Sequence, residues 1–191
     1  MSEALNIVAA PLAGARASGL VELSDAGLRG MITLRGDLAS PALVAALLTE
    51  TGCGVPAQRR LISGERGKVA WMSPDELLVM VAYDRAESVT SALNAALADG
   101  FFTAANVSDA RAMITLTGAQ ARDVLAKVCP VDFADFPVGG VRRTRAAQVA
   151  AALWCEEDTR WSLVCFRSVG QYVWDLLATV ALPGGEVGLY R

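Results

Sequence analysis

Histidine is absent from this chain of 191 residues. The absence removes the commonest metal ligand and the commonest general base near neutral pH. Without histidine, no serine can be activated in the usual catalytic triad. The four cysteines show no CxxC spacing, so we expect no zinc site and predict reduced, mostly buried thiols. They are Cys53, Cys129, Cys155 and Cys165.

Positive charge and long apolar runs are also scarce. Lysine and arginine number 17 against 20 acidic residues, and the net charge of −3 argues against a nucleic-acid partner. No apolar stretch reaches the ~18 residues that a membrane span needs. No lysine or arginine precedes the short apolar run Leu5–Leu12, so a secretory signal is not expected. We therefore expect a cytoplasmic protein without a membrane anchor.

What the chain has in excess is apolar residues, at 53% of the total. Two interpretations remain open at about even weight. The surplus either covers a large protein–protein interface or reflects an Ala- and Val-rich sequence with an ordinary core. The first interpretation also predicts self-association of the isolated chain.

The chain repeats parts of itself at an almost constant separation. Three pairs of segments match at offsets of 82 to 84 positions, which is too long for a solenoid unit but suits two fused copies of one small unit. The pairs are Met31–Gly36 with Met113–Gly118, Leu23–Ala26 with Val107–Ala110, and Trp71 with Trp154.

Local patterns predict the same element order in both halves, namely strand, strand, helix, hairpin and helix. In the first half, Ser40 and Pro41 open a helix that buries Leu43, Leu47 and Leu48 and ends at Gly52. The other expected elements are strands at 19–23 and 30–34, a hairpin of 68–71 with 77–81, and a helix from a capping box at Asp84 and Glu87 to about Ala98.

Patterns in the second half predict the corresponding strands, helices and hairpin. Its strands are expected at 101–105 and 111–117, its first helix at 120–128, and its hairpin at 147–154 with 161–166. A capping box at Ser168 and Gln171 opens the last helix, which runs to about Ala181. Residues 1–15 fit no periodic pattern and are interpreted as an arm that docks on a partner.

Few residues are candidates for chemistry. Asp75 and Glu76 form a carboxylate pair, but a solvated turn is the better interpretation, as for Glu156–Asp158 at the matching place. Arg142, Arg143 and Arg145 follow a Gly-Gly pair and fit either an anion clamp or, with more weight, a solvated or subunit-facing edge.

The aromatic residues of the second half also fit two roles. Trp154, Trp161, Tyr172 and Trp174 would suit stacking on a flat heterocycle, but such residues are more often core or interface anchors. Tyr172 and Trp174 are the candidate anchors for a partner. Because they point apart on one helix, at most one of them joins the core stripe with Leu177.

Segments spread over residues 67–180 resemble the gamma subunit family of heterotetrameric sarcosine oxidase. The first is Trp71–Leu78, similar to a Trp-x-Gly-Pro-Asp-Glu-x-Leu pattern, with Ser73 where the family commonly has glycine. The other matching segments are 107–111, 117–125, 129–132, 136–139, 143–144 and 166–174.

This family is similar in turn to the folate-binding domain of the glycine-cleavage aminomethyltransferase group. The resemblance implies an α+β fold, internally duplicated, of two β-α-β-type subdomains with swapped first strands. It places Trp71 and Met72 where that group has catalytic acid, which disfavours aminomethyl transfer. The expected organisation is an arm at 1–15 and one unit at 16–191, with pseudo-repeats at about 16–100 and 101–183.

By resemblance, the chain is a non-catalytic structural subunit of a complex that oxidatively demethylates sarcosine to glycine. FAD, FMN, NAD, zinc and tetrahydrofolate are expected in the alpha, beta and delta partners. No catalytic, cofactor-binding or metal residue is expected in this chain, and whether it is itself an enzyme stays open. The alternative is a stand-alone folate-binding or aminomethyltransferase-like one-carbon protein.

Overall fold

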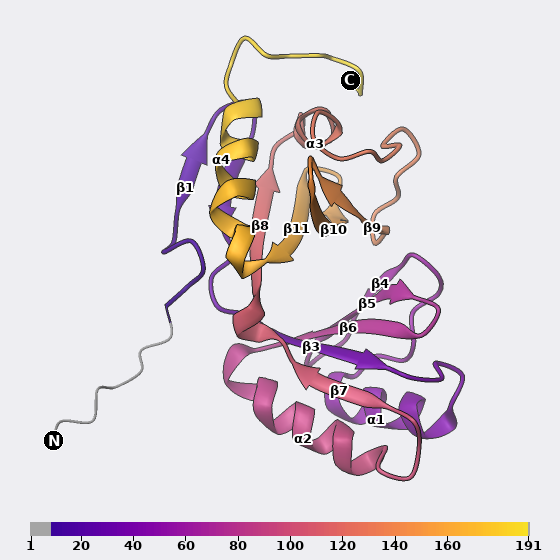
Figure 1. Cartoon of the computed structure of the whole chain (residues 1–191). Helices are drawn as coiled ribbons and strands as arrows, with labels where there is room; N and C mark the ends of the chain where they lie inside the picture. Colours follow the sequence, from indigo (N-terminus) through magenta and orange to yellow (C-terminus); the bar gives the residue numbers. More distant parts are fainter. Residues whose placement is uncertain (1–8, 191) are drawn as a thin grey trace, which may run out of the picture.

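Two antiparallel β-sheets in contact with each other, with helices on their outer sides, make up the part of the chain that the computed structural model describes, residues 9–190. The α-helices are α1 (Pro41–Thr51), α2 (Ala86–Ala96), α3 (Ala121–Ala126) and α4 (Gly170–Val180). Figure 1 shows α1 and α2 on the lower sheet and α3 and α4 on the upper one. Within residues 9–190, no helix has the length and apolar character needed to cross a membrane.

The lower sheet has five strands. Their order across the sheet is β4 (Leu61–Ser63), β5 (Lys68–Ser73), β6 (Glu76–Val81), β3 (Gly30–Arg35) and β7 (Thr103–Asn106). Strands β5 and β6 pair directly and form the predicted first hairpin, with a bulge between Trp71 and Ser73.

The upper sheet has six strands. Their order is β1 (Arg16–Ser18), β2 (Glu22–Asp25), β8 (Arg111–Thr117), β11 (Arg160–Phe166), β10 (Val149–Glu157) and β9 (Val141–Ala146). Strands β10 and β11 form the predicted second hairpin, again with a bulge close to the turn.

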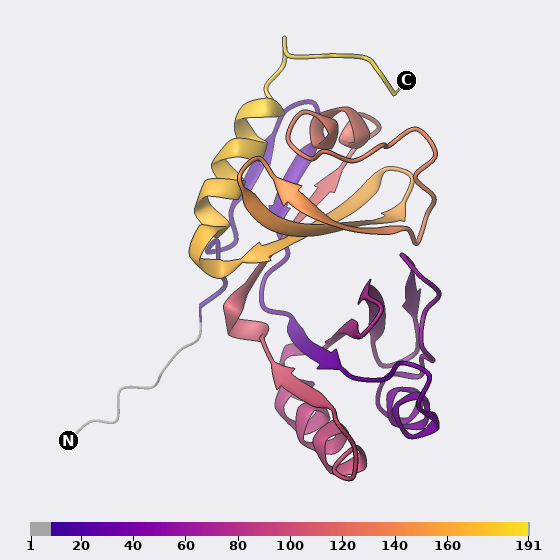
Figure 2. The ribbon, with the colours of Figure 1, turned by 45° about the vertical axis from the view of Figure 1, so that its right-hand side comes forward.

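Each sheet contains strands from the other half of the sequence, namely β1 and β2 in the upper sheet and β7 in the lower one. Strand β2 pairs with β8, whereas β7 pairs with β3. The chain leaves both strands in the same way, because Ala26 donates to the carbonyl of Met113 at 2.9 Å and Val107 donates to that of Met31 at 2.8 Å. Figure 2 shows β3 and β7 lying above the helices of the lower half.

The core consists of three apolar clusters. One lies between the upper sheet and its helices, and another lies between the lower sheet and its helices. The third joins the two sheets through Met31, Ala70 and Met80 of the lower sheet and Met113, Trp154 and other residues of the upper one. Because successive side chains of a strand point to opposite faces of the sheet, each sheet packs one face against its helices and the other face into this third cluster.

Helix α1 begins at Pro41 and ends at Gly52, as predicted. Gly52 has φ 75° and its N–H bonds the carbonyl of Leu48, the left-handed end that glycine adopts without a steric penalty. The predicted inward face is wrong at one position, since Leu43 and Leu47 are buried but Leu48 is 55% exposed. A helix in contact with one sheet buries a narrow stripe, which leaves Leu48 outside it.

The two predicted capping boxes do not form. Glu87 accepts a hydrogen bond from Asn106, and Gln171 donates one to Asp175. Helices α2 and α4 instead begin after single 3-10 turns, at Tyr83–Arg85 and Arg167–Val169. The chain leaves the preceding hairpin directly into that turn, so the turn, rather than a side-chain cap, sets the helix start.

Three strands were not predicted from the sequence, and two matches were misaligned. The missed strands are β1, β4 and β9, which are short or rich in arginine. In the first hairpin, Trp71 pairs with Leu77 directly before the bulge. In the second hairpin, the pair directly before the bulge is Cys155 with Trp161, so Cys155 and not Trp154 corresponds to Trp71. A one-residue slip turns a side chain to the other face of the sheet.

The other misaligned match concerns the first strand of each half. Leu23 and Asp25 lie in β2, but Ser108–Ala110 is a 3-10 turn that follows β7. The hydrogen bonds of Ala26 and Val107 described above correct this match by three positions.

Part of the predicted arm packs on its own chain. Residues 1–8 lie outside the described residues. Further along, Leu12 is buried in the core of the upper sheet, and Arg167 donates to the carbonyl of Ala9 at 3.0 Å. At the other end, Leu189 and Tyr190 each donate a main-chain N–H to the buried carboxylate of Asp123 at 3.0 Å.

Candidate functional site

The two sheets meet at a seam between the edge strands β4 and β9. Arg60 and Gly140 form an isolated antiparallel bridge there. Leu61 donates to the carbonyl of Gly139 at 2.7 Å, and Val141 donates to that of Arg59 at 2.8 Å. The two bonds are reciprocal, so the seam is closed in the same way from both sides.

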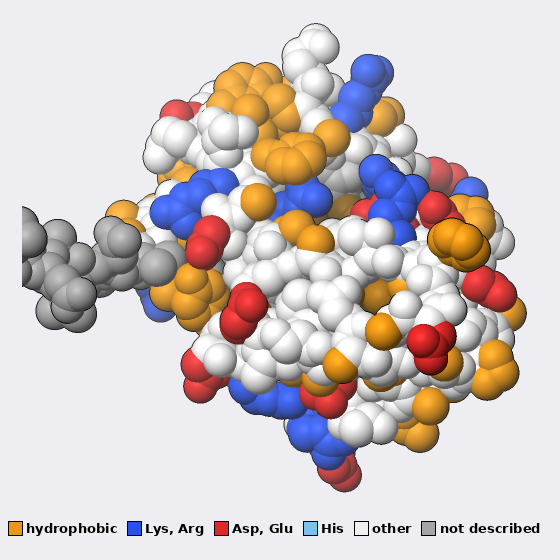
Figure 3. Space-filling model, turned by 60° about the horizontal axis from the view of Figure 1, so that its bottom comes forward, with side chains coloured by type: hydrophobic (Ala, Val, Ile, Leu, Met, Phe, Trp, Pro, Cys, Tyr) orange, Lys and Arg blue, Asp and Glu red, His pale blue; other side chains and the backbone are white. Residues whose placement is uncertain are grey.

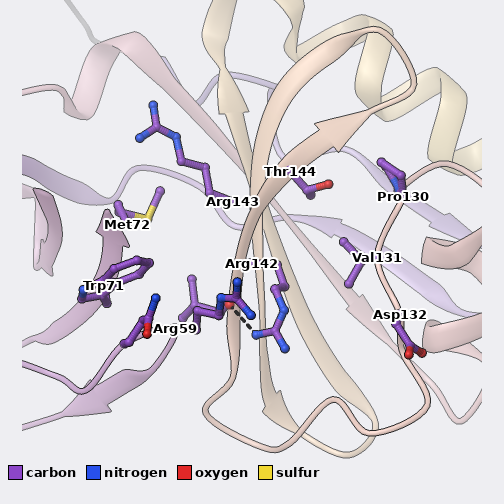
Figure 4. Close-up of a pocket in the computed structure, with 11 residues that line it drawn as sticks. Arg59, Trp71, Met72, Pro130, Val131, Asp132, Arg142, Arg143 and Thr144 are labelled. Carbon is purple, nitrogen blue, oxygen red and sulfur yellow. Dashed lines mark hydrogen bonds between the residues drawn. The ribbon is translucent and has the colours of Figure 1, made fainter. Parts of the chain in front are cut away.

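A hollow of about 530 Å³ opens beside this seam. Figure 4 shows Trp71 and Met72 on one side, β9 with Arg142, Arg143 and Thr144 in the middle, and the segment from Pro130 to Asp132 on the other side. Burial and then the nearby charge of Arg59 lower the pKa of Arg142, which nevertheless stays protonated at neutral pH. The charged residues that line the hollow are therefore mainly cationic, namely Arg59, Arg142 and Arg143, with the carboxylate of Asp132 at its far side.

The structure does not bring the three arginines of β9 into one clamp. Arg142 and Arg143 are neighbours on a strand and point to opposite faces. The guanidinium of Arg142 lies 4.8 Å from the ring centre of Phe136, while Arg143 pairs with Glu76 at 3.1 Å. Arg145 is exposed. This geometry favours the interpretation of an edge over that of an anion clamp.

Glu156 is the polar residue that the sequence analysis misjudged most. It was interpreted as part of a solvated turn, yet its side chain is only 13% exposed. It accepts hydrogen bonds from Lys68 at 3.0 Å, Trp154 at 3.1 Å and Ser162 at 2.9 Å. Burial opposes its ionisation, but these bonds and the charge of Lys68 outweigh that effect and hold the pKa of Glu156 below its ordinary value.

Lys68 belongs to the lower sheet and Glu156 to the upper one, so this ion pair ties the two sheets together. A second hollow, of about 370 Å³, lies beside it and is also lined by Arg29, Arg66 and Arg160. A Glu-Glu-Asp run usually indicates a solvent-exposed turn. Only the partners contributed by distant strands reveal that the first of these acids is buried.

The predicted carboxylate pair splits in a similar way. Asp75 is exposed at the turn, where hydrogen bonds from Ser73 and then Arg35 lower its pKa. Glu76 is only 13% exposed and pairs with Arg143 of the other sheet. The solvated-turn interpretation is thus right for Asp75 and wrong for Glu76.

The large aromatic residues mostly serve the core. Trp154 and Trp161 are fully buried, and Trp161 packs against Phe133 and Phe136 with ring centres 5.6 Å and 4.8 Å away. Trp174 also lies in the core, whereas Tyr172 is 45% exposed. This agrees with the prediction that at most one of the α4 aromatics joins the core, and it leaves Tyr172 as the candidate anchor.

The four cysteines are free and buried, as predicted. Burial raises the pKa of Cys129 to about 12 and that of Cys165 to about 11. Among residues 9–190, no group of three or more histidine, cysteine, aspartate or glutamate side chains could hold a metal ion.

We expect these thiols to be unreactive in the folded protein. At pH 8, a thiol with a pKa near 11 is ionised in only about one molecule in a thousand, and the thiolate is the reactive form. A disulfide reagent should therefore label the native chain slowly and all four thiols after unfolding. Tyr172→Cys, which places a thiol on an exposed site, serves as the reactive control. Rapid labelling of the native wild-type chain would contradict the burial.

Residues 35–182 match the sequence model of the sarcosine oxidase, gamma subunit family. The chain belongs to this family. The sarcosine oxidase subunit gamma of Corynebacterium sp. (strain P-1) is 30% identical over 161 residues, which cover 82% of this chain and 78% of that one. The subunit gamma of an Arthrobacter species is also 30% identical, covering 84% and 79%.

Solved structures share the fold of this gamma-family chain. A chain of the heterotetrameric sarcosine oxidase from Corynebacterium sp. U-96, in complex with pyrrole 2-carboxylate, superposes with a TM-score of 0.81. It is 24% identical and the match covers 94% of this chain and 97% of that one. The glycine cleavage aminomethyltransferase T of Bartonella henselae has a TM-score of 0.60 at 12% identity, over 80% of this chain and 44% of that one.

Proposed function

We propose that this chain is a structural, non-catalytic subunit of a heterotetrameric oxidase that demethylates sarcosine. Membership of the gamma subunit family carries the proposal. The state of its reactive groups supports it, because Glu76 and Glu156 are both neutralised by cations and the thiols are buried. Carboxylates paired in this way stabilise the fold, and buried thiols are not accessible to a substrate.

The chemistry of the complex then belongs to its other subunits. By the family resemblance these are alpha, beta and delta chains that carry FAD, FMN, NAD, zinc and the tetrahydrofolate site, in the cytoplasm. Tyr172 is the aromatic that we assign to a partner interface, because it is half exposed on α4. Figure 3 shows one face of the chain, on which apolar side chains form separate groups among polar ones.

We also propose that the two halves, about 16–100 and 101–183, descend from one duplicated unit that exchanged its first strands. Supporting this, the sheets share the order β4-β5-β6-β3-β7 and β9-β10-β11-β8-β2. Helices α2 and α4 both have 11 residues and bury the same four positions. Asp25 and Asn106 end corresponding strands and accept the N–H two residues on.

The alternative, a stand-alone folate-binding or aminomethyl-transferring protein, has weaker support. The likeness to the aminomethyltransferase is one of fold at 12% identity. Trp71 and Met72 occupy the positions that the resemblance assigns to the acidic residues of that group. Neither of these two side chains can act as a proton-transferring acid.

Co-expression with the three partner chains tests the proposed function. We expect one assembly that contains this chain, with sarcosine oxidase activity, when its mass is measured under native conditions. We also expect no flavin absorbance in the isolated chain. An active oxidase that assembles fully without this chain would refute the structural role.

A further inference from the structure

The outer edge of β9 exposes main-chain hydrogen-bonding groups. Val141 donates its N–H outward, to Arg59, rather than to β10. Successive residues of a strand direct these groups to opposite sides, so Arg143 and Arg145 also direct theirs away from β10. The bridge to β4 ends at Arg60 and Gly140, and beyond it the hollow begins. Within residues 9–190, no other strand pairs with this edge.

Positive charge is concentrated along the same edge. Arg143 has Glu76 as its carboxylate partner, but Arg59, Arg142 and Arg145 form no ion pair with any residue in the described part of the chain. The charge of Arg59 contributes to the lowered pKa of Arg142, so the two guanidinium groups stand close enough to repel each other. Like charges gathered beside a hollow favour an anionic occupant.

The backbone conformation of Arg59 is a second observation that favours an anionic occupant at this edge. Arg59 has φ 60° and Gly139, its counterpart in the reciprocal bonds of the seam, has φ 72°. Glycine adopts this conformation without a Cβ clash, whereas other residues adopt it at a cost. An arginine side chain therefore projects from a position where the geometry itself favours glycine.

We propose that the outer edge of β9 takes an extended acidic segment of a partner subunit as an added strand. The main-chain groups of Arg143 and Arg145 would continue the ladder, and carboxylates of the segment would meet Arg59, Arg142 and Arg145. A second copy of this chain is a poor occupant, because pairing β9 with itself sets arginine beside arginine. The proposal rests on the subunit role and names one of its contacts.

Charge reversal in the co-expressed complex tests the electrostatic part. Arg142→Glu with Arg145→Glu should weaken retention of this chain at least tenfold, measured by native mass analysis across a dilution series. The wild-type interaction should also weaken as salt increases. Arg16→Glu is the matched control, because Arg16 lies on β1, the opposite edge of the same sheet. Equal loss in the control would overturn the assignment to β9.

A proline substitution tests the added strand itself. Arg145→Pro removes an outward N–H and leaves the bonds to β10 in place, so it should weaken the complex more than Arg145→Ala does. Circular dichroism of each variant chain checks that it is folded. Equal retention of the two variants would show that no strand is added, and that the arginines only protect a bare edge from pairing.

A photo-crosslinking residue at position 145 identifies the occupant. We expect mass spectrometry to find it joined to a peptide of another subunit rich in aspartate and glutamate. Crosslinks to a second copy of this chain, to a non-acidic peptide, or to nothing would overturn the proposal. If the wild-type complex assembles but these variants behave like it, this inference fails alone. If the wild-type chain joins no complex, the proposed function fails first.

Discussion

Trp161→Ala is expected to lower the free energy of unfolding by about 4 kcal/mol, within the range for large-to-alanine changes at fully buried aromatic positions. Trp161 is 0% exposed and packs against the stacked rings of Phe133 and Phe136, with the guanidinium of Arg122 5.5 Å from its ring. Its removal leaves a cavity that the closely packed neighbours fill only in part. Urea unfolding followed by circular dichroism measures the loss.

Two variants control for this result. Trp161→Phe keeps most of the packing and should cost less than the alanine variant. Trp71→Ala removes a tryptophan of the other hairpin that is only half buried, and it should also cost less. If Trp71→Ala were as destabilising as Trp161→Ala, the difference in burial between the two side chains would not account for the loss.

Glu156→Ala is expected to cost about 3 kcal/mol at neutral pH, since it leaves three donors without their acceptor. The donors are Lys68, Trp154 and Ser162. Glu156→Gln keeps an acceptor but loses the charge, so it should cost less. A double-mutant cycle with Lys68→Ala should give a favourable coupling energy, because the pair joins the two sheets. A coupling near zero would mean that each side chain acts independently.

The effect of Glu156 should depend on pH in a defined direction. Because the pKa of Glu156 is lowered on folding, the native state favours the ionised form. Its stabilisation is complete above the pKa of the unfolded chain, about 4.5, and is lost as the pH falls through the lower folded value. The difference in stability between wild type and Glu156→Gln should therefore shrink below about pH 4.5. A difference that stays constant from pH 6 to pH 3 would contradict this assignment.

The site was harder to predict than the fold. A solvated or subunit-facing edge at Arg142 and Arg145 was predicted with more weight than an anion clamp, but the strand β9 that carries these residues was not predicted. Arg59 gave no signal, since its left-handed backbone depends on a bridge to a residue 80 positions away. Glu76 and Glu156 were assigned to solvent because turn residues usually are exposed. Their burial comes from Arg143 and Lys68, each of which the opposite sheet supplies.

The sequence by itself determined the two hairpins, the end of α1 at Gly52 and the burial of the four thiols. These features depend on turn chemistry, apolar content and periodicity, which act between residues close along the chain. Only the tertiary structure decided which face each tryptophan occupies, which strands leave their own half, and which carboxylates are buried. Those outcomes depend on ladder register and on partners far along the chain, such as Lys68 for Glu156, 88 positions away, and Arg143 for Glu76, 67 positions away. A shift of one residue there reverses every side chain of a strand, and local sequence does not encode that choice.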